Sequence, residues 1–336
     1  MCGLTGFFSL KRNFKALPSR NELEIMTKTL IHRGPDSGNT YYSQENGLGI
    51  GHRRLAIRDT SPLGSQPMKS PCGRYIGAYN GEIYNHQEIT QEIISCGLRL
   101  TGSSDTEVIM ASISIWGVPS TIKKLNGMFA LAVYHYDRQT LYLVRDRVGI
   151  KPLYWGRNQD NLYFASELKA FYGINSWDPK ICQKSLASYM RHNYVPSPKT
   201  IFSNTFKLAP GTILIANRKN EINIETYWNF QENVKVELNS QPKLPKKELI
   251  EQTKTILTNS VKQQMVSDVP LGTLLSGGID STLITASANE LSSKAIKTFT
   301  IGFDQKGFDE APYARKIATH LGTEHTELYA TSEDAI

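Results

Sequence analysis

The chain has 336 residues, of which 40% are hydrophobic and 21% are charged, with a formal net charge of +7 at pH 7. This length allows two domains, and the composition is that of a globular protein in a reducing cytoplasm, because the four cysteines are scattered without a C-x-x-C pair. The absence of a long apolar run, a leader peptide, a basic helix or an RNA-binding motif argues against membrane and nucleic-acid partners.

The first predicted element carries a candidate nucleophile. Residues 2–10 have the pattern of a buried strand that begins at Cys2, in Met1-Cys2-Gly3. Removal of Met1 would place a free α-amino group on the same residue as the thiol. With a pKa of about 7.7–8.0, that amine can act as the base that forms the thiolate. Cys2 is therefore a candidate N-terminal nucleophile, and the alternative is that the second residue is a cysteine by chance.

Two capping patterns predict helices in the first half of the chain. Ser19-x-x-Glu22 precedes a helix with Leu23, Met26 and Leu30 on one face, and residues 31–37 break that helix into a loop. The second pattern, Ser104-x-x-Glu107, precedes a helix expected to reach about residue 116.

Short apolar segments before, between and after these helices predict strands. They lie at 2–10, 47–57, 75–79, 128–136 and 140–144, and residues 137–139 have the character of a hairpin turn between the last two. Strands and helices that come in runs favour an α+β fold with stacked antiparallel sheets and helices outside.

The pattern changes after residue 228. Residues 231–247 are polar, contain two prolines and lack an apolar period, so we predict a linker. Beyond it, helices at 248–265, 281–291 and 311–321 alternate with strands at 271–275, 298–303 and 325–329. This alternation predicts a parallel α/β sheet. In the first of these helices, four residues are compatible with one buried stripe: Leu249, Ile256, Val261 and Met265.

A glycine-rich segment, Leu274-Leu275-Ser276-Gly277-Gly278-Ile279-Asp280-Ser281, joins a predicted strand to a predicted helix. Paired glycines let backbone N–H groups approach phosphate oxygens, and the helix N-terminus favours negative charge. The two serines offer hydroxyl donors, and the aspartate is a possible Mg²⁺ ligand. Because the Gly-Lys-[Ser/Thr] of a Walker loop is missing, a different type of phosphate loop is predicted, with a plain turn as the alternative.

The S-G-G-x-D-S sequence at 276–281 resembles the pyrophosphate-binding motif of the ATP pyrophosphatases. Together with Met1-Cys2-Gly3, the whole chain resembles glutamine-hydrolysing asparagine synthetases of the asparagine synthase B type. The resemblance implies a class II glutamine amidotransferase domain of the α+β, Ntn-type αββα fold at 2–212 and a connection at 213–247. The N-terminal part of an α/β parallel-sheet ATP-pyrophosphatase domain is implied at 248–336.

The same resemblance assigns the catalytic groups. Cys2 would attack the glutamine carboxamide and form a γ-glutamyl thioester. The side-chain amide of Asn80 and the backbone N–H of Gly81 match the family's oxyanion hole, and two neutral donors suit a developing negative charge. Glu82, the next residue, falls in the substrate site. Without the family, Asn80-Gly81 would be interpreted as a hairpin turn.

Two further residues match the groups that hold the ends of glutamine. Arg54 corresponds to the clamp on the α-carboxylate, and Asp105 to the partner of the α-ammonium group. Their alternative interpretations are a surface cation and a part of a helix cap, respectively.

In the second domain the resemblance implies ATP and Mg²⁺. The residues assigned to ATP and pyrophosphate are Leu274, Ser276, Gly277, Gly278, Asp280, Ser281 and Ile301, with Asp280 also assigned to Mg²⁺. Leu274 and Ile301 would contact adenine through their backbone, although both also suit buried positions in a strand. No histidine or cysteine pattern predicts a structural metal, and Cys72, Cys96 and Cys182 are expected to be small buried side chains.

The implied reaction uses glutamine, aspartate and ATP. Ammonia released from glutamine would aminate a β-aspartyl adenylate in the cytoplasm, and the products would be asparagine, AMP and pyrophosphate. One alternative is an amidotransferase of this family acting on another carboxylate, such as a surface-polysaccharide uronic acid. Another is a non-enzymatic nucleotide-binding scaffold. A homodimer is left open. Because the family's second Gly-rich acidic loop is missing, we expect a fragment in which the acceptor site cannot be assigned.

Overall fold

The computed structural model describes residues 1–336 except 13, 159, 241–243, 306, 332 and 336. The chain divides into two compact units, 1–240 and 241–336, and each is described by itself. Within the described residues, no helix has both the length and the apolar character needed to cross a lipid bilayer.

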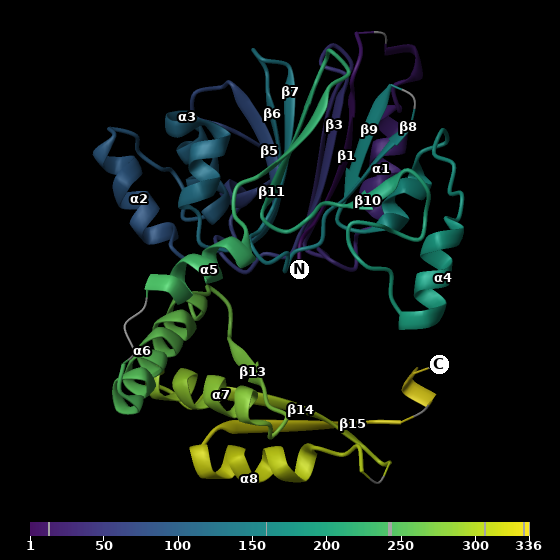
Figure 1. Ribbon diagram of the computed structural model, residues 1–336. Coiled ribbons are helices and arrows are strands. Elements are labelled where there is room, and N and C mark those ends of the chain that lie inside the picture. Colours follow the sequence, from purple (N-terminus) through teal and green to yellow (C-terminus); the bar gives the residue numbers. More distant parts are fainter. Residues whose placement is uncertain (13, 159, 241–243, 306, 332, 336) are drawn as a thin grey trace. The chain divides into compact units, whose positions relative to one another are not determined.

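Two antiparallel sheets of six strands each form the centre of the first unit, as far as its residues are described (Figure 1). The first sheet has the order β10 (Thr205–Lys207), β8 (Tyr154–Asn158), β9 (Asn161–Ala165), β1 (Gly3–Ser9), β3 (Leu48–Arg54), β2 (Ser37–Ser43). The second has the order β12 (Ile222–Thr226), β11 (Thr212–Asn217), β7 (Thr140–Arg145), β6 (Gly127–His135), β5 (Tyr75–Ile83), β4 (Met68–Lys69).

Helices cover the outer faces of the two sheets. The α-helices of this unit are α1 (Arg20–Lys28), α2 (His86–Ser95), α3 (Asp105–Lys124), α4 (Gln183–His192) and α5 (Phe230–Ser240). Shorter 3-10 helices are η1 (Phe14–Ala16), η2 (Pro62–Gly64) and η3 (Leu168–Gly173). In Figure 1, α2 and α3 lie beside β5 and β6, and α1 lies beside β1 and β9. This αββα layering is the predicted α+β fold.

Three apolar clusters fill the spaces between these layers. One joins α2 and α3 to the second sheet, one lies between the sheets, and one joins α1 and η3 to the first sheet. The predicted capping box at Ser19 and Glu22 is present, and Leu23, Met26 and Leu30 are fully buried. The helix predicted to reach about residue 116 ends there, because Gly117 has a non-helical φ of 74°, and the rest of α3 is a second helical segment after this kink.

The second unit contains a parallel three-stranded sheet in the described residues, as the alternation of helices and strands predicted. Its order is β13 (Gly272–Leu274), β14 (Lys297–Phe303), β15 (Glu324–Ala330), and its helices are α6 (Lys246–Gln264), α7 (Ile279–Leu291) and α8 (Ala311–Leu321), with η4 (Glu333–Ala335). Residues along β14 alternate between exposed and buried, so that Phe299, Ile301 and Phe303 are all exposed.

Several expectations about the connection between the domains are wrong. Most of residues 213–226, assigned to a connection, lie in β11 and β12. Ile213 and Leu214 of β11 are buried in the second sheet, and β12 pairs with β11. Residues 230–240, most of them expected in the linker, form α5. Residues 241–243 of that linker lie outside the described residues.

Two burial expectations are also wrong. In α6 only Val261 of the expected stripe is buried, whereas Leu249 and Ile256 are exposed. Helical spacing identified a possible face, but within the described residues no element covers its N-terminal half. Cys72 and Cys96 are exposed and Cys182 is half-buried, because each lies at a turn or a helix end.

Candidate active site

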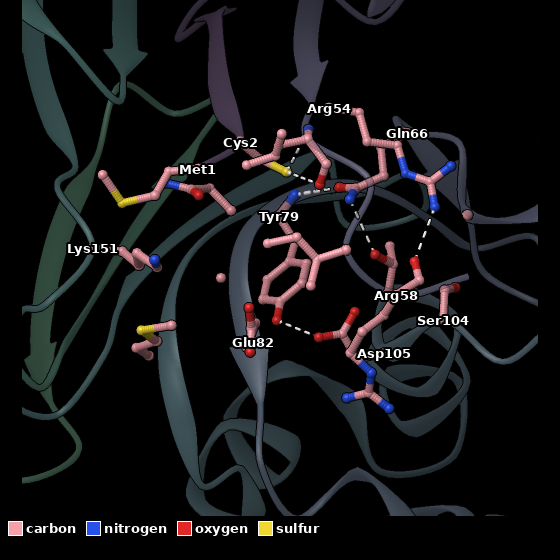
Figure 2. Close-up of a pocket in the computed structure, with 17 residues that line it drawn as sticks. Met1, Cys2, Arg54, Arg58, Gln66, Tyr79, Glu82, Ser104, Asp105 and Lys151 are labelled. Atoms are coloured by element: carbon pink, nitrogen blue, oxygen red, sulfur yellow. Dashed lines mark hydrogen bonds between the residues drawn. The ribbon is translucent and has the colours of Figure 1, made fainter. Parts of the chain in front are cut away.

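One cavity of about 340 Å³ in the first unit gathers the residues assigned to glutamine (Figure 2). Its lining includes the six residues Cys2, Arg54, Asn80, Gly81, Glu82 and Asp105. They come from the residue before β1, the end of β3, the second half of β5 and the start of α3. Side chains up to 103 positions apart in sequence therefore face one space.

The thiol of Cys2 is held at the first residue before β1. The backbone N–H of Leu55 donates to Cys2 Sγ at 3.3 Å, and the thiol can donate to the Leu55 carbonyl at 3.6 Å. Burial raises the pKa of the Cys2 thiol, and the Leu55 contact partly opposes this. The thiol consequently needs a local base to become a nucleophile.

An unpartnered amide lies in the same cavity. Asn80 is 1% exposed, and among the described residues its Nδ2 has no hydrogen-bond partner. A buried N–H without a partner is costly, so it marks a place where an acceptor is expected. Asn80 and Gly81 lie inside β5, which rules out the hairpin-turn interpretation. A side chain at Gly81 would place Cβ 2.1 Å from the Met128 carbonyl oxygen, so this position requires glycine.

The guanidinium of Arg54 is fixed by the backbone that follows it. Nη1 donates to the Ser61 carbonyl at 2.8 Å, and Nη2 donates to the carbonyls of Arg58 and Asp59. Arg54 is 8% exposed, so it is not a surface cation. A guanidinium has five N–H groups, so donors remain for an anion in the cavity.

Asp105 faces the cavity as the first residue of α3. Its Oδ2 accepts from Tyr79 Oη at 2.7 Å and from the backbone N–H of Ile83 at 3.2 Å. The helix cap itself is Ser104, whose hydroxyl accepts from the Glu107 N–H. Asp105 therefore has a free oxygen direction for a cation, beyond its position in the cap.

Two further charged residues, Glu82 and Lys151, line the cavity (Figure 2). Burial, with the Asp105 charge second, raises the pKa of Glu82, and burial lowers the pKa of Lys151. Lys151 is 5% exposed, and nothing in its sequence context, Gly149-Ile150-Lys151-Pro152, distinguished it from a turn residue.

The sequence interpretation also missed the residues that support these groups. Arg33 Nε donates to the Cys2 carbonyl at 3.0 Å and Nη1 to Glu167 at 2.9 Å, which holds the start of β1. Gln66 accepts from the Tyr79 N–H and donates to Thr106 at 3.0 Å, joining β5 to α3. In the sequence, Arg33 occurs within His-Arg-Gly-Pro-Asp and Gln66 precedes a proline. Neither context predicts which residue the side chain will contact.

The phosphate loop of the second unit has the local geometry of an anion site. Gly277 has a φ of 84°, and the residue before α7, Gly278, is an N-cap without a side chain to cap the helix. Ser276 Oγ and Ser281 Oγ lie 2.9 Å apart, and the Ser281 hydroxyl can donate to the Gly278 carbonyl at 3.2 Å. Uncapped N–H groups and hydroxyl donors at a helix N-terminus suit a phosphate group.

The other residues assigned to ATP lie on the surface of this unit. Leu274 is 80% exposed and Ile301 is 54% exposed, so the interpretation of both as buried strand residues is wrong. Asp280 is exposed in the first turn of α7. No group of three or more potential ligands for a metal occurs among the described residues, so a cation here would depend on the phosphates as well.

Comparison with protein families gives two matches in chain order. Residues 1–228 match the profile described as "Glutamine amidotransferase domain", and residues 252–336 match the profile described as "Asparagine synthase". The first match covers more than half of the chain.

Curated relatives are similar over nearly the whole chain. The sequence is 34% identical to "Asparagine synthetase [glutamine-hydrolyzing] 1" of Bacillus subtilis over 99% of this chain and 51% of the relative. It is 33% identical to "Putative asparagine synthetase [glutamine-hydrolyzing] 2" of Methanocaldococcus jannaschii over 99% of this chain and 66% of the relative. The chain thus spans about half to two thirds of the length of these relatives.

Among solved structures, the glutamine phosphoribosylpyrophosphate amidotransferase from B. subtilis aligns with a TM-score of 0.52 at 15% identity. The alignment covers 99% of this chain and 91% of that structure. At this identity the likeness supports the fold alone, which is that of the Ntn-type amidotransferases.

Proposed function

Because this chain belongs to the family of glutamine-hydrolysing asparagine synthetases, we propose that it releases ammonia from glutamine at Cys2 for the ATP-dependent amidation of aspartate. The observation that carries the glutaminase half is the buried, unpartnered Nδ2 of Asn80, which lies in the same cavity as the Cys2 thiol. A structural asparagine in a strand would have its amide satisfied.

Glutamine binding uses the two charges that the cavity already holds in place. The donors of Arg54 that remain after its three carbonyl contacts bind the α-carboxylate, and the second oxygen of Asp105 binds the α-ammonium group. These contacts leave the side chain of the substrate to extend toward Cys2. Glu82 lines the same space and completes the substrate site.

Chemistry begins once Met1 has been removed and Cys2 carries a free α-amino group. That amine takes the thiol proton, and the sulfur attacks the carboxamide carbon. The Asn80 amide and the Gly81 N–H stabilise the oxyanion, and the amine returns the proton to the departing nitrogen, which leaves as ammonia. Water then hydrolyses the γ-glutamyl thioester to glutamate and restores the thiol.

The second unit is proposed to bind ATP at the loop 276–281. Its uncapped helix N-terminus and the paired hydroxyls of Ser276 and Ser281 would hold the β- and γ-phosphates that leave as pyrophosphate. Asp280 would hold Mg²⁺, which neutralises phosphate charge when bound. The backbone at Leu274 and Ile301 would contact adenine. Aspartate and ATP would give the β-aspartyl adenylate and pyrophosphate. Ammonia would then attack the β-carbonyl carbon and displace AMP, which gives asparagine.

The test separates the two half-reactions. Purified protein is supplied with glutamine, aspartate and Mg-ATP, and glutamate, AMP and asparagine are measured independently. Glutamate formation, with covalent labelling of Cys2 by a glutamine-like diazoketone, would support the glutaminase. Asparagine and AMP in equal amounts would support aspartate as acceptor, whereas AMP that appears only with another carboxylate would refute it. Absence of both glutamate and labelling would refute the assignment of Cys2.

A further inference from the structure

The two groups proposed to hold the ends of glutamine come from elements that do not adjoin in sequence. Arg54 ends β3, and Asp105 begins α3, with 50 residues between them. Specific binding of an amino acid requires their separation to match the distance between its α-carboxylate and α-ammonium groups. Figure 2 shows both side chains facing one cavity. Something outside the cavity must therefore fix one relative to the other.

Asp59 makes contacts toward both groups. Its backbone carbonyl accepts a hydrogen bond from Arg54 Nη2. Its side-chain Oδ2 accepts from the backbone N–H of Ser103 at 2.9 Å, two residues before Asp105. Its Oδ1 accepts from the Ser61 N–H at 3.3 Å and from the Ser61 hydroxyl, and the Ser61 carbonyl in turn accepts from Arg54 at 2.8 Å. One residue thus links both clamps.

Both the burial and the backbone of Asp59 fit such a role. It is 7% exposed and is not among the residues that line the cavity, so it does not touch the substrate. Its φ of 49° lies in the left-handed region, which is unfavourable for a residue with a side chain. That conformation turns the carbonyl toward Arg54 while the carboxylate reaches Ser103.

Two neighbouring glycines leave room for the contacts among Asp59, Arg54 and Ser103. A Cβ at Gly102 would lie 2.7 Å from Asp59 Oδ2, and a Cβ at Gly64 would lie 2.0 Å from Arg54 Nη2. Neither glycine has a left-handed φ. A side chain at either glycine would therefore collide with the Asp59 or the Arg54 side chain. This steric observation supports the arrangement independently of the hydrogen bonds.

We propose that Asp59 is a positioning residue for glutamine recognition, which sets the separation between the Arg54 guanidinium and the Asp105 carboxylate. This inference rests on the proposed glutaminase function. Asp59 acts through Arg54 and the segment before Asp105, and the property that it controls is selectivity for a substrate with both charged α-groups. Loss of the Asp59 carboxylate lowers the affinity for glutamine without altering the reactivity of the Cys2 thiol.

The decisive variant is Asp59→Asn in the full chain. An amide keeps one acceptor oxygen, so either Ser61 or Ser103 loses its partner. KM for L-glutamine should rise about tenfold, the equivalent of one charge-assisted hydrogen bond, while kcat changes less than about threefold. Glutaramate, which lacks the α-amino group, and 4-aminobutanamide, which lacks the carboxylate, should be hydrolysed nearly as well by the variant as by the wild type.

Gly102→Ala places a methyl group against the Asp59 carboxylate without removing it, and it should also raise KM for L-glutamine. Asp178→Asn is the matched control, because it removes an exposed carboxylate paired with Lys180, and KM should stay unchanged. The rate at which iodoacetamide alkylates Cys2 should be equal in all variants, since it requires neither clamp.

Unchanged KM in both Asp59→Asn and Gly102→Ala would overturn the proposal. It would also be overturned if glutamine and the two analogues lost activity equally, or if Cys2 alkylation changed, since Asp59 would then only support the fold. Failure of the proposed function gives a different result, because the wild-type protein itself would neither hydrolyse glutamine nor be labelled by the diazoketone.

Discussion

Replacing Asn80 with alanine should separate catalysis from stability. The change removes the one buried amide in the cavity that lacks a partner among the described residues. If Nδ2 donates to the oxyanion, its loss costs about 2.7–4 kcal/mol in the transition state, and kcat falls by about 10²–10³. Because the oxyanion forms after binding, KM for glutamine should change little.

Stability should respond in the opposite way to that expected for an ordinary buried polar residue. An unpartnered buried N–H costs about 1–3 kcal/mol in the folded state, and its removal offsets most of the packing lost on truncation. We therefore expect the Tm of the first unit to stay within about 4 °C of the wild-type value. Glutamate release under steady-state conditions and thermal unfolding followed by circular dichroism give the two quantities. An unchanged kcat, or a fall in kcat accompanied by a loss of more than about 10 °C in Tm, would refute the reasoning.

Three further predictions concern separate parts of the chain. Cys2→Ala should abolish glutamate formation and leave Mg-ATP binding unchanged, and mass spectrometry of the active wild-type protein should show that Met1 is missing; hydrolysis by the variant would exclude the nucleophile. Burial lowers the pKa of His52 to about 4, and its ring bonds to the Tyr79 carbonyl at 3.0 Å. Because this folded-state pKa is below the unfolded value of about 6.5, the free energy of unfolding should be constant above pH 6.5 and should fall by about 3 kcal/mol between pH 6.5 and pH 4. Urea titrations of His52→Gln should lack this pH-dependent loss. Gly277→Val should weaken Mg-ATP binding, measured by equilibrium dialysis, and spare glutamate formation, because a Cβ there would lie 2.8 Å from Tyr313 Cβ and φ is 84°; unchanged affinity would remove this loop from the ATP site.

Much of the fold could be predicted because its signals are local. The capping pattern at Ser19 and the alternation of helices and strands after residue 248 both depend on neighbours within a few positions. The linker was misplaced because α5 is a polar helix whose composition matches that of a loop. The burial of Ile256 was mispredicted because a helical face does not specify whether another element covers it.

The candidate site divides in the same way. Cys2, Asn80 and Gly81 occur in recognisable motifs, so family resemblance located them, and the structure brings them into one cavity. Asp59 could not be predicted, because its importance arises from contacts with Arg54 and with Ser103, 44 positions away. A motif records which residues react, whereas the residues that hold them are visible only after folding.

The position of β1 inside its sheet has a consequence for synthesis of the protein. The strand that follows Cys2 pairs with β3 on one side and with β9 on the other, and Thr5 donates to the carbonyl of Phe164, 159 residues later. While the chain leaves the ribosome, the thiol end therefore waits for most of the first unit to emerge before its sheet can close.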